Sequence, residues 1–142
     1  ILGMGKIGTA LALRLKALGA AVTVCVRKSR DSALGESQGL RTVTFDRLAG
    51  QIKEYKVIYN TVPAVVLDKN ELDNMASDSL LVDLASLPGG VNFEYAREKN
   101  IKTVQALSLP GKVAPETSAE NMAKVIFNII KELAGEAAKN VN

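Results

Sequence analysis

The sequence predicts an α/β fold of the doubly wound, Rossmann-like class, with a parallel sheet and helices on both faces. Two observations support this prediction. A Gly-x-Gly-x-x-Gly motif at Gly3, Gly5 and Gly8 follows two apolar residues and leads directly into a helix-like stretch. Short β-branched runs then alternate with helix-like segments along the chain, which is the pattern of a parallel sheet. At 142 residues, the length fits one dinucleotide-binding domain over 1–142.

Each part of the opening motif has a physical role. Gly3 permits a tight turn out of a strand, Gly5 lets a pyrophosphate approach the backbone, and Gly8 lets the helix pack closely on the strand. Lys6 and Ile7 complete the helix start, whose free N–H groups and dipole attract phosphate. Glycines also gather in ordinary turns, so the motif indicates a dinucleotide site only together with its flanking strand and helix.

The first half of the chain is predicted to alternate between helices and strands. Gly19 and Gly39 are expected to end two of the helices, and Asp46 could cap a third. The spacing of apolar residues predicts helices over 6–18, 31–39 and 47–52, and strands over 21–26 and 42–44.

The second half continues the alternation and ends in the clearest helix. Thr117 to Glu120 has the spacing of a capping box at its start, and the end after Gly135 is expected to fray. An apolar stripe along this helix indicates core or interdomain packing. The predicted strands are 56–60, 80–84 and 102–107, the helices 69–76 and 92–99, and the stripe Met122, Val125, Ile126, Ile129, Ile130 and Leu133.

Composition excludes several function classes. The net charge of +3 comes from scattered cations with few aromatic residues, which argues against a nucleic-acid surface. No apolar run approaches a membrane span, and no signal peptide precedes the fold. The absence of histidine excludes a His base and His-ligated metals, and no other metal-ligand spacing occurs. The single Cys25 rules out a disulfide framework and fits a reducing cytoplasm.

The first strand has only two residues before its first glycine, fewer than such strands usually carry. The sequence therefore predicts that the N-terminal part of this strand, and a preceding domain, lie outside it.

The residues after the second predicted strand favour NADP over NAD. An NAD site usually has Asp or Glu there to bond the ribose 2′-OH, but that place holds Val26 and Arg27. The neighbouring Lys28, Ser29 and Arg30 offer the donors that a 2′-phosphate needs. Solvated loop cations are the alternative, and Asp31 is a contrary sign because it could reach a 2′-OH.

Two further strand ends carry site candidates. Asn60, Thr61, Val62 and Pro63 suit contact with the adenosine or a ribose, or form an ordinary turn. Asp83 would lie near the nicotinamide and bond its carboxamide or ribose, with Ala85 close by, or cap the next turn. Ligands in such sheets bind at the carboxyl ends of the strands, where these residues meet.

The loops resemble those of dehydrogenases that act on 2-hydroxy acids. That family carries a catalytic Arg after the fifth strand and a His in the following loop. The corresponding stretches here are Ala85-Ser86-Leu87 and Pro110-Gly111-Lys112, so the resemblance does not extend to that chemistry.

Three stretches stand out together: Asn60-Thr61-Val62-Pro63, the stretch from Asp83 to Gly90 and the stretch from Leu109 to Thr117. This combination resembles the family of the dipicolinate synthase A-subunit more closely. The resemblance implies a C-terminal nucleotide-binding domain that oxidises dihydrodipicolinate to dipicolinate during sporulation, with NADP as acceptor. It also implies a second, flavoprotein-like subunit, and we expect an oligomer.

A dicarboxylate substrate favours cations and N–H donors nearby. Lys112 is placed for charge pairing and Ser86 for a hydrogen bond, while Gly89, Gly90 and Gly111 could present backbone N–H groups. Lys112 as a solvated cation and Ser86 as a turn cap are the alternatives. Aromatisation drives the oxidation, so positioning matters more than a strong base.

Two other interpretations stay open. One is the cofactor domain of a different dehydrogenase, of the 2-hydroxy-acid or alanine-dehydrogenase type. The other is a non-catalytic nucleotide-sensing module, which needs no substrate cleft. The glycine-rich loops at the nicotinamide end favour a substrate over a sensor.

Overall fold

The computed structural model describes residues 1–108, 112 and 114–139. The chain divides into two compact units, Ile1–Leu107 and Ser108–Asn142. The first unit holds the sheet and the glycine motif, and the second holds one long helix.

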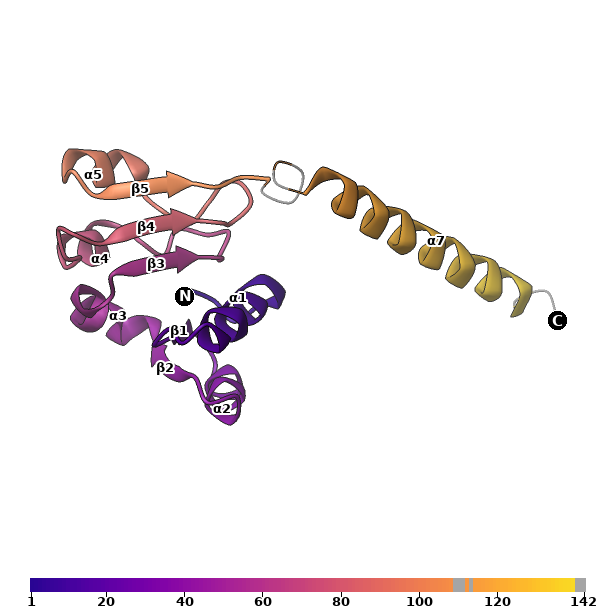
Figure 1. Ribbon diagram of the computed structural model, residues 1–142, viewed down its shortest axis with the longest axis horizontal. Coiled ribbons are helices and arrows are strands. Elements are labelled where there is room, and N and C mark those ends of the chain that lie inside the picture. Colours follow the sequence, from indigo (N-terminus) through magenta and orange to yellow (C-terminus); the bar gives the residue numbers. More distant parts are fainter. Residues whose placement is uncertain (109–111, 113, 140–142) are drawn as a thin grey trace. The chain divides into compact units, whose positions relative to one another are not determined.

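A parallel sheet forms the centre of the first unit (Figure 1). β1 pairs with β2, and β3, β4 and β5 pair in that order, all in parallel. Leu2 bridges both Cys25 of β1 and Asn60 of β3, so the first two residues lie between these strands. The sheet order is therefore β2, β1, residues 1–2, β3, β4, β5, which confirms the Rossmann-like prediction. The strands are Thr23–Val26 (β1), Arg41–Thr44 (β2), Val57–Asn60 (β3), Leu80–Asp83 (β4) and Lys102–Gln105 (β5).

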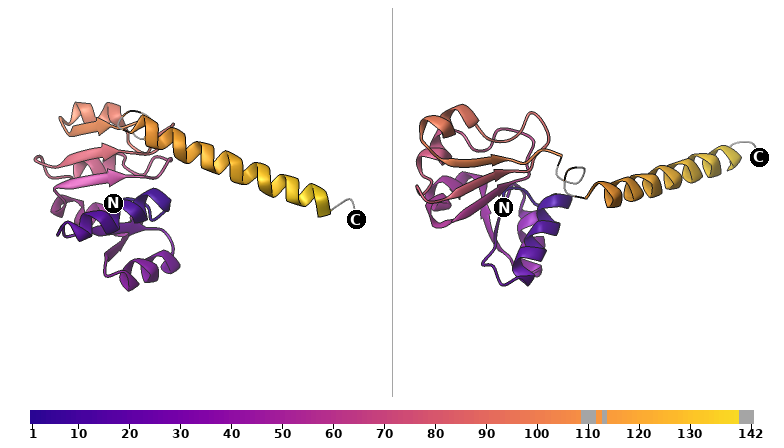
Figure 2. Two further views of the ribbon diagram at one scale, coloured as in Figure 1. Left: turned by 45° about the vertical axis from the view of Figure 1, so that its right-hand side comes forward. Right: turned by 45° about the horizontal axis from the view of Figure 1, so that its top comes forward.

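Two apolar cores lie on opposite faces of this sheet, because neighbouring strand residues point to opposite sides. One includes Ala12, Val24 and Val26 and lies under the first two helices. The other includes Leu48, Leu72 and Ala96 and lies under the remaining helices. The helices, visible in Figures 1 and 2, are Lys6–Ala17 (α1), Ser29–Ser37 (α2), Phe45–Gln51 (α3) with the 3-10 turn Ile52–Glu54, Lys69–Asp73 (α4) and Phe93–Glu98 (α5).

Several helix ends follow local sequence signals. Gly19 has a φ of 88° and ends α1, as its position predicted. Asp68 and Glu71 form a capping box at α4, and the Asn92 side chain accepts a bond from Tyr95 N–H at α5. The expected cap at Asp46 is wrong: α3 begins at Phe45 after Thr44, so Asp46 lies within its first turn.

The second unit consists chiefly of α7, Pro115–Lys139. It begins before the expected capping box, because Pro115 suits a first helical position where the missing N–H costs nothing. Thr117 therefore lies inside the helix, and the helix extends past Gly135. Met122, Ile126 and Ile129 of the apolar stripe are exposed, whereas the side chains of Val125, Ile130 and Leu133 lie outside the described residues.

Candidate functional site

The glycine loop leaves the central strand at the carboxyl edge of the sheet. Gly3 has a φ of 89°, and a Cβ there would lie 2.8 Å from Val62 Cγ2. A Cβ on Gly8 would overlap the carbonyl oxygen of Gly3 and lie 3.2 Å from Thr61 Oγ1. Both positions therefore require glycine, and the expected tight turn and close helix packing are confirmed.

Gly5 differs from its neighbours because the space around it is open. A Cβ at Gly5 would have no neighbour within 4 Å, and Gly5, Lys6 and Ile7 are exposed. Gly5 caps α1 without a side-chain bond, and the backbone bonds of the helix begin with Thr9 N–H to Gly5 O. The N–H groups of residues 6–8 precede the first intrahelical donor. This is a cradle that fits the pyrophosphate of a dinucleotide.

The end of β1 carries exposed cations beside a second helix start. Arg27, Lys28 and Ser29 are all exposed. The α2 helix begins at Ser29 rather than at residue 31 as expected, so Lys28 is its N-cap. The Arg27 guanidinium lies over the Phe45 ring, 6.0 Å from its centroid. A guanidinium, an ammonium group and a helix N-terminus at one edge form a surface suited to a phosphate.

The next strand contributes residues that the sequence reasoning missed. Val26 pairs with Thr44 in register, so the residues after β2 lie beside those after β1. These include Phe45, which supports Arg27, and the exposed Arg47. The signal was the same one that identified Arg27, namely a cation just after a strand. Asp46 lies between them, and a hydrogen bond from the Thr44 side chain holds the pKa of its carboxyl below the usual value.

Asn60 and Asp83 end β3 and β4 and are fully buried, at 0% exposure each. Asn60 Nδ2 donates to Asp83 Oδ1 at 2.8 Å and to Val62 O at 3.0 Å, and Val62 N–H donates to Asn60 Oδ1. Asp83 also accepts bonds from Ala85 N–H at Oδ1 and from Gly90 N–H at Oδ2. Asp83 and Asn60 therefore support the edge from beneath, and neither presents a surface that a ligand could touch.

The loop after β3 packs against the glycine loop. Thr61 donates to Leu2 O through both its N–H, at 3.1 Å, and its hydroxyl, at 2.8 Å. Thr61 and Val62 are half-buried, and Pro63 is exposed. This loop is thus fixed to the start of the cofactor cradle.

The loop after β4 turns back beneath the edge. Ser86 is exposed, whereas Ala85 is buried. The expectation that Gly89 and Gly90 present free N–H groups is wrong, because they donate to Ser86 O and Asp83 Oδ2 respectively. Ser86 is therefore the polar group of this loop that faces solvent.

The third expected loop belongs to the second unit. Lys112 is exposed there, and its N–H donates to Ser108 O. Gly111 lies outside the described residues, as do Leu109, Pro110 and Val113.

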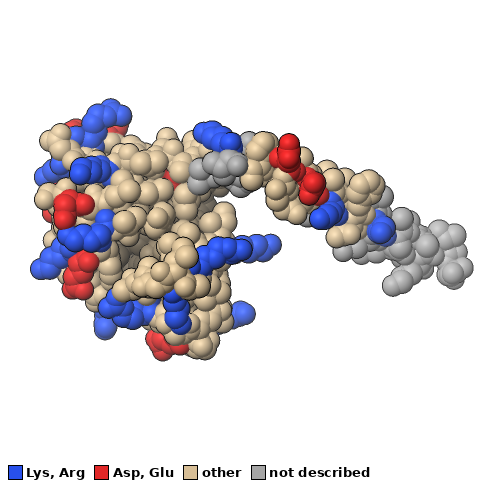
Figure 3. Space-filling model, in the orientation of Figure 1, with Lys and Arg blue, Asp and Glu red and all other residues tan. Residues whose placement is uncertain are grey.

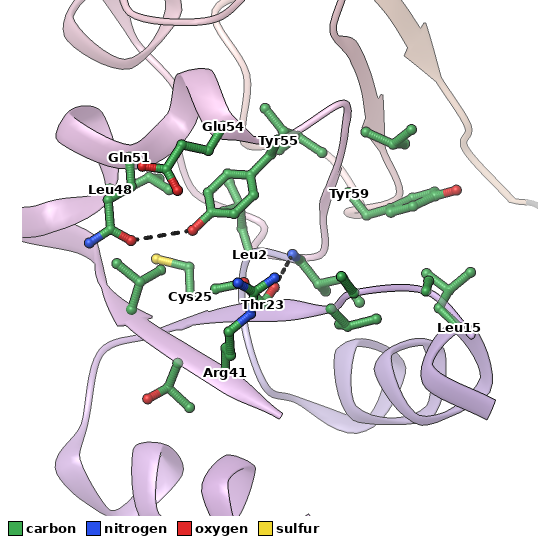
Figure 4. Close-up of a pocket in the computed structure, with 18 of the residues that line it drawn as sticks. Leu2, Leu15, Thr23, Cys25, Arg41, Leu48, Gln51, Glu54, Tyr55 and Tyr59 are labelled. Carbon is green, nitrogen blue, oxygen red and sulfur yellow. Dashed lines mark hydrogen bonds between the residues drawn. The ribbon is translucent and has the colours of Figure 1, made fainter. Parts of the chain in front are cut away.

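A cavity of about 750 Å³ lies at the opposite, amino end of the strands. In Figure 4, Tyr55 and Tyr59 lie on one side of it and Thr23 and Arg41 on the other. The Ile1 amine donates to Thr23 O at 2.8 Å at this end of the sheet. Ligands of parallel sheets bind at the carboxyl ends of the strands, so this cavity is separate from the cofactor cradle.

On the face drawn in Figure 3, blue and red side chains are interspersed along the left of the first unit, and blue side chains outnumber red ones over the rest of it. Among the residues that the structure describes, no helix is long and apolar enough to cross a bilayer. Within the same residues, no cluster of three His, Cys, Asp or Glu side chains could hold a metal ion.

Comparison with known proteins identifies the family to which this domain belongs. Residues 1–86, from the glycine cradle to Ser86, match the family model described as "D-isomer specific 2-hydroxyacid dehydrogenase, NAD binding domain". The chain belongs to this NAD-binding domain family. The match confirms the resemblance of the loops to those dehydrogenases and supports a nicotinamide nucleotide as cofactor.

The chain is also similar to the dipicolinate synthase A-subunit, which confirms the second resemblance. The chain is 37% identical over 139 residues to that protein from Bacillus subtilis strain 168, covering 98% of this chain and 47% of the relative. Crystal structures of the same protein from Bacillus subtilis and Bacillus halodurans superpose with TM-scores of 0.90 and 0.87, each at 37% identity. They cover 95% and 90% of this chain, but 45% and 44% of those chains. The chain thus spans about half the length of these relatives.

Proposed function

We propose that this chain is the cofactor domain of an NADP-dependent oxidoreductase that oxidises dihydrodipicolinate to dipicolinate during sporulation. The observation that carries the proposal is the open cradle at Gly5, where a helix start and a side-chain-free approach meet. The similarity to the dipicolinate synthase A-subunit supplies the substrate class.

We assign a separate part of the cofactor or substrate to each loop along the carboxyl edge of the sheet. The N–H groups of residues 6–8 bind the pyrophosphate, and Arg27, Lys28 and Ser29 bind the 2′-phosphate. A bound nicotinamide would accept a hydride from one carbon of the dihydropyridine ring, and the proton from a second ring carbon would pass to solvent as the ring becomes aromatic. The loops at Thr61 and Ser86 position that ring and exclude water around it. Ser86 donates a hydrogen bond to a substrate carboxylate.

We further propose that the chain acts within a longer polypeptide whose preceding segment completes the central strand. Leu80 N–H bonds Lys56 O and Leu84 N–H bonds Asn60 O, so alternate β3 residues Val57 and Tyr59 face away from β4. They face the 750 Å³ cavity, which the Ile1 amine also borders. An extended segment entering there would pair with β1 and β3 at once.

The remaining parts of the proposal concern partners and location. We propose an oligomeric assembly with a second, flavoprotein-like subunit, and the similarity to a protein named as one subunit of a synthase supports the presence of a partner subunit. A cytoplasmic location is supported by the single cysteine, Cys25, which is free and buried.

Replacing Arg27 with alanine tests the choice of cofactor. Loss of a charged hydrogen bond costs about 1.5–3 kcal/mol, so R27A should weaken NADP+ binding roughly ten- to hundredfold. Binding of NAD+ should change little. Isothermal titration with both cofactors gives the comparison, with Arg14→Ala, an exposed cation in the last turn of α1, as the matched control. Equal losses for both cofactors in R27A would contradict the assignment.

Substrate class is tested separately. The longer protein is titrated with NADPH and then with dipicolinate, and the fluorescence of the bound nicotinamide is followed. Dipicolinate should change that fluorescence in a saturable way, because the substrate ring lies against the nicotinamide. Absence of any change, with NADPH still bound, rules out dipicolinate as the product.

A further inference from the structure

The carboxylate of Asp83 occupies an unusual position for a residue at the cofactor edge. It is fully buried, and the groups that hold it are an amide and two backbone N–H groups rather than a cation. Burying a charge is costly unless hydrogen bonds replace its water. Three such bonds at 2.8, 3.1 and 3.3 Å provide that replacement.

The three donors come from two different loops. Asn60 is the last residue of β3 and is tied to Val62, in the loop that follows, by two hydrogen bonds. Ala85 and Gly90 are near the two ends of the loop after β4. Asp83 therefore joins both loops at a single buried point, and their relative position depends on it.

Close packing leaves this junction little freedom. A Cβ on Gly90 would overlap Asn60 Nδ2 and approach Val62 O, and a Cβ on Gly89 would lie 2.9 Å from Asp83 Oδ2. The carbonyl of Gly90 accepts bonds from the N–H groups of Val66 and Leu67. The end of the loop after β4 is thus fixed to the end of the loop after β3.

The junction lies on one side of the central strand only. The phosphate-binding residues that follow β1 lie on the other side of residues 1–2, with β2 beyond them. An extended dinucleotide across this edge would place its adenosine half over β1 and β2 and its nicotinamide half over β3 and β4. The buried junction would therefore affect one half of the cofactor.

We propose that Asp83, locked by Asn60, is a positioning residue that sets the nicotinamide end of the cofactor site without touching the cofactor. The inference rests on the proposed function, since it concerns the same site. Asp83 acts through the two loops that it joins.

The chemistry of the pair makes the proposal specific. Asp83 serves as an acceptor at both oxygens, so Asp83→Asn must turn its NH2 toward at least one N–H donor. Asn60 must both donate and accept, so Asn60→Ala removes the links to Asp83 and Val62 together. Both variants loosen the same junction from opposite sides.

The test compares two ligands that differ only at the nicotinamide end. NADP+ and 2′-phospho-ADP-ribose, which lacks the nicotinamide, are titrated calorimetrically into the wild type, D83N and N60A. Loss of a buried hydrogen bond to a charge predicts roughly a tenfold or greater weakening for NADP+. The loss for 2′-phospho-ADP-ribose should be about threefold or less, because the adenosine half is held over β1 and β2.

Ser79→Ala is the matched control for general destabilisation. Ser79 is also buried and donates to Tyr55 O at 2.7 Å, but it lies at the amino end of β4. S79A should lower the melting temperature while leaving the ratio of the two affinities unchanged. If D83N cannot be purified folded, Asn60→Ser carries the same expectation with a smaller loss.

A double-variant cycle separates the junction from direct contact. D83N and N60A should not add, because each breaks the same unit. Additive losses, an effect of D83N alone, or equal losses for both ligands would overturn the proposal. Repeating the comparison with NAD+ and ADP-ribose keeps the test independent of the phosphate. A wild type that binds none of the four ligands would instead contradict the proposed function.

Discussion

Gly5 and Gly8 lie three residues apart in one loop, yet alanine should affect them in opposite ways. A Cβ on Gly8 would overlap the Gly3 carbonyl oxygen and lie 3.2 Å from Thr61 Oγ1. The oxygen belongs to the backbone, so α1 or the loop must shift. Overpacking of this kind costs about 1–3 kcal/mol or more. For a domain of this size the melting temperature of G8A should fall by roughly 5–15 °C.

Gly5→Ala should leave the fold largely intact and act on the ligand. No atom lies within 4 Å of the Cβ position, and the φ of −76° suits any residue. Alanine is a weaker N-cap than glycine, so the unfolding free energy should fall by about 1 kcal/mol. This corresponds to a few degrees in melting temperature. The new methyl group would stand where the pyrophosphate approaches, so NADP+ affinity should fall by roughly tenfold or more.

Thermal unfolding followed by circular dichroism and calorimetric titration with NADP+ measure the two effects on the same samples. If G5A binds NADP+ as tightly as the wild type does, the pyrophosphate does not approach at Gly5. If G8A melts within about a degree of the wild type, Gly8 is not closely packed against the Gly3 carbonyl.

Other expectations follow from particular contacts. Gly90→Ala introduces a Cβ that would overlap Asn60 Nδ2, so it should lower the unfolding free energy by about 2 kcal/mol. Urea unfolding measures this loss, and a midpoint equal to that of the wild type would contradict it. A hydrogen bond from Asn92 lowers the pKa of Asp68, and hydrogen bonds from Lys99 and Tyr95 lower the pKa of Asp73, each from the ordinary value of 3.8. A hydrogen bond from Lys56 lowers the pKa of Asp78 in the same way. The stabilisation from these contacts is present above pH 3.8 and is lost as pH falls through the lowered pKa values of the folded protein. The melting temperature should therefore drop below about pH 4, and less so in D73N; identical pH profiles for D73N and the wild type refute this. A chain with about four native residues added before Ile1 should melt several degrees higher, because each new strand hydrogen bond contributes about 1 kcal/mol; an unchanged melting temperature excludes the strand completion.

Features that depend on local sequence were predictable. The glycine spacing at Gly3, Gly5 and Gly8 requires a turn and a helix start because only glycine meets those steric demands. The strands and helices follow from apolar periodicity, and their order defines the sheet. The place of Arg27 directly after a strand was predictable, and strand ends in a parallel sheet share one edge, so its binding of a phosphate stays a prediction.

Features that depend on the direction of a side chain were not predictable from the sequence. Asp83 stands at a strand end whether it points to a ligand or into the protein, and its burial depends on Asn60 and Gly90 meeting it in space. Phe45 was missed because it acts by contact with Arg27, which follows the neighbouring strand. The start of α7 was misplaced because the capping-box spacing at Thr117 competes with Pro115, which suits the first turn of a helix.

The junction of Asn60, Asp83 and Gly90 has a consequence for how this domain can change over generations. The donor and acceptor atoms of Asn60 and Asp83 match in only one arrangement, and Gly90 supplies the room for it. A replacement at one position leaves an unmatched polar group or an overlap at the others. Substitutions should therefore be inherited jointly at residues 60, 83 and 90, although 30 positions of sequence separate the first from the last. An exposed neighbour such as Pro63 lies outside this junction, so a substitution there should not require a matching change at residues 60, 83 or 90.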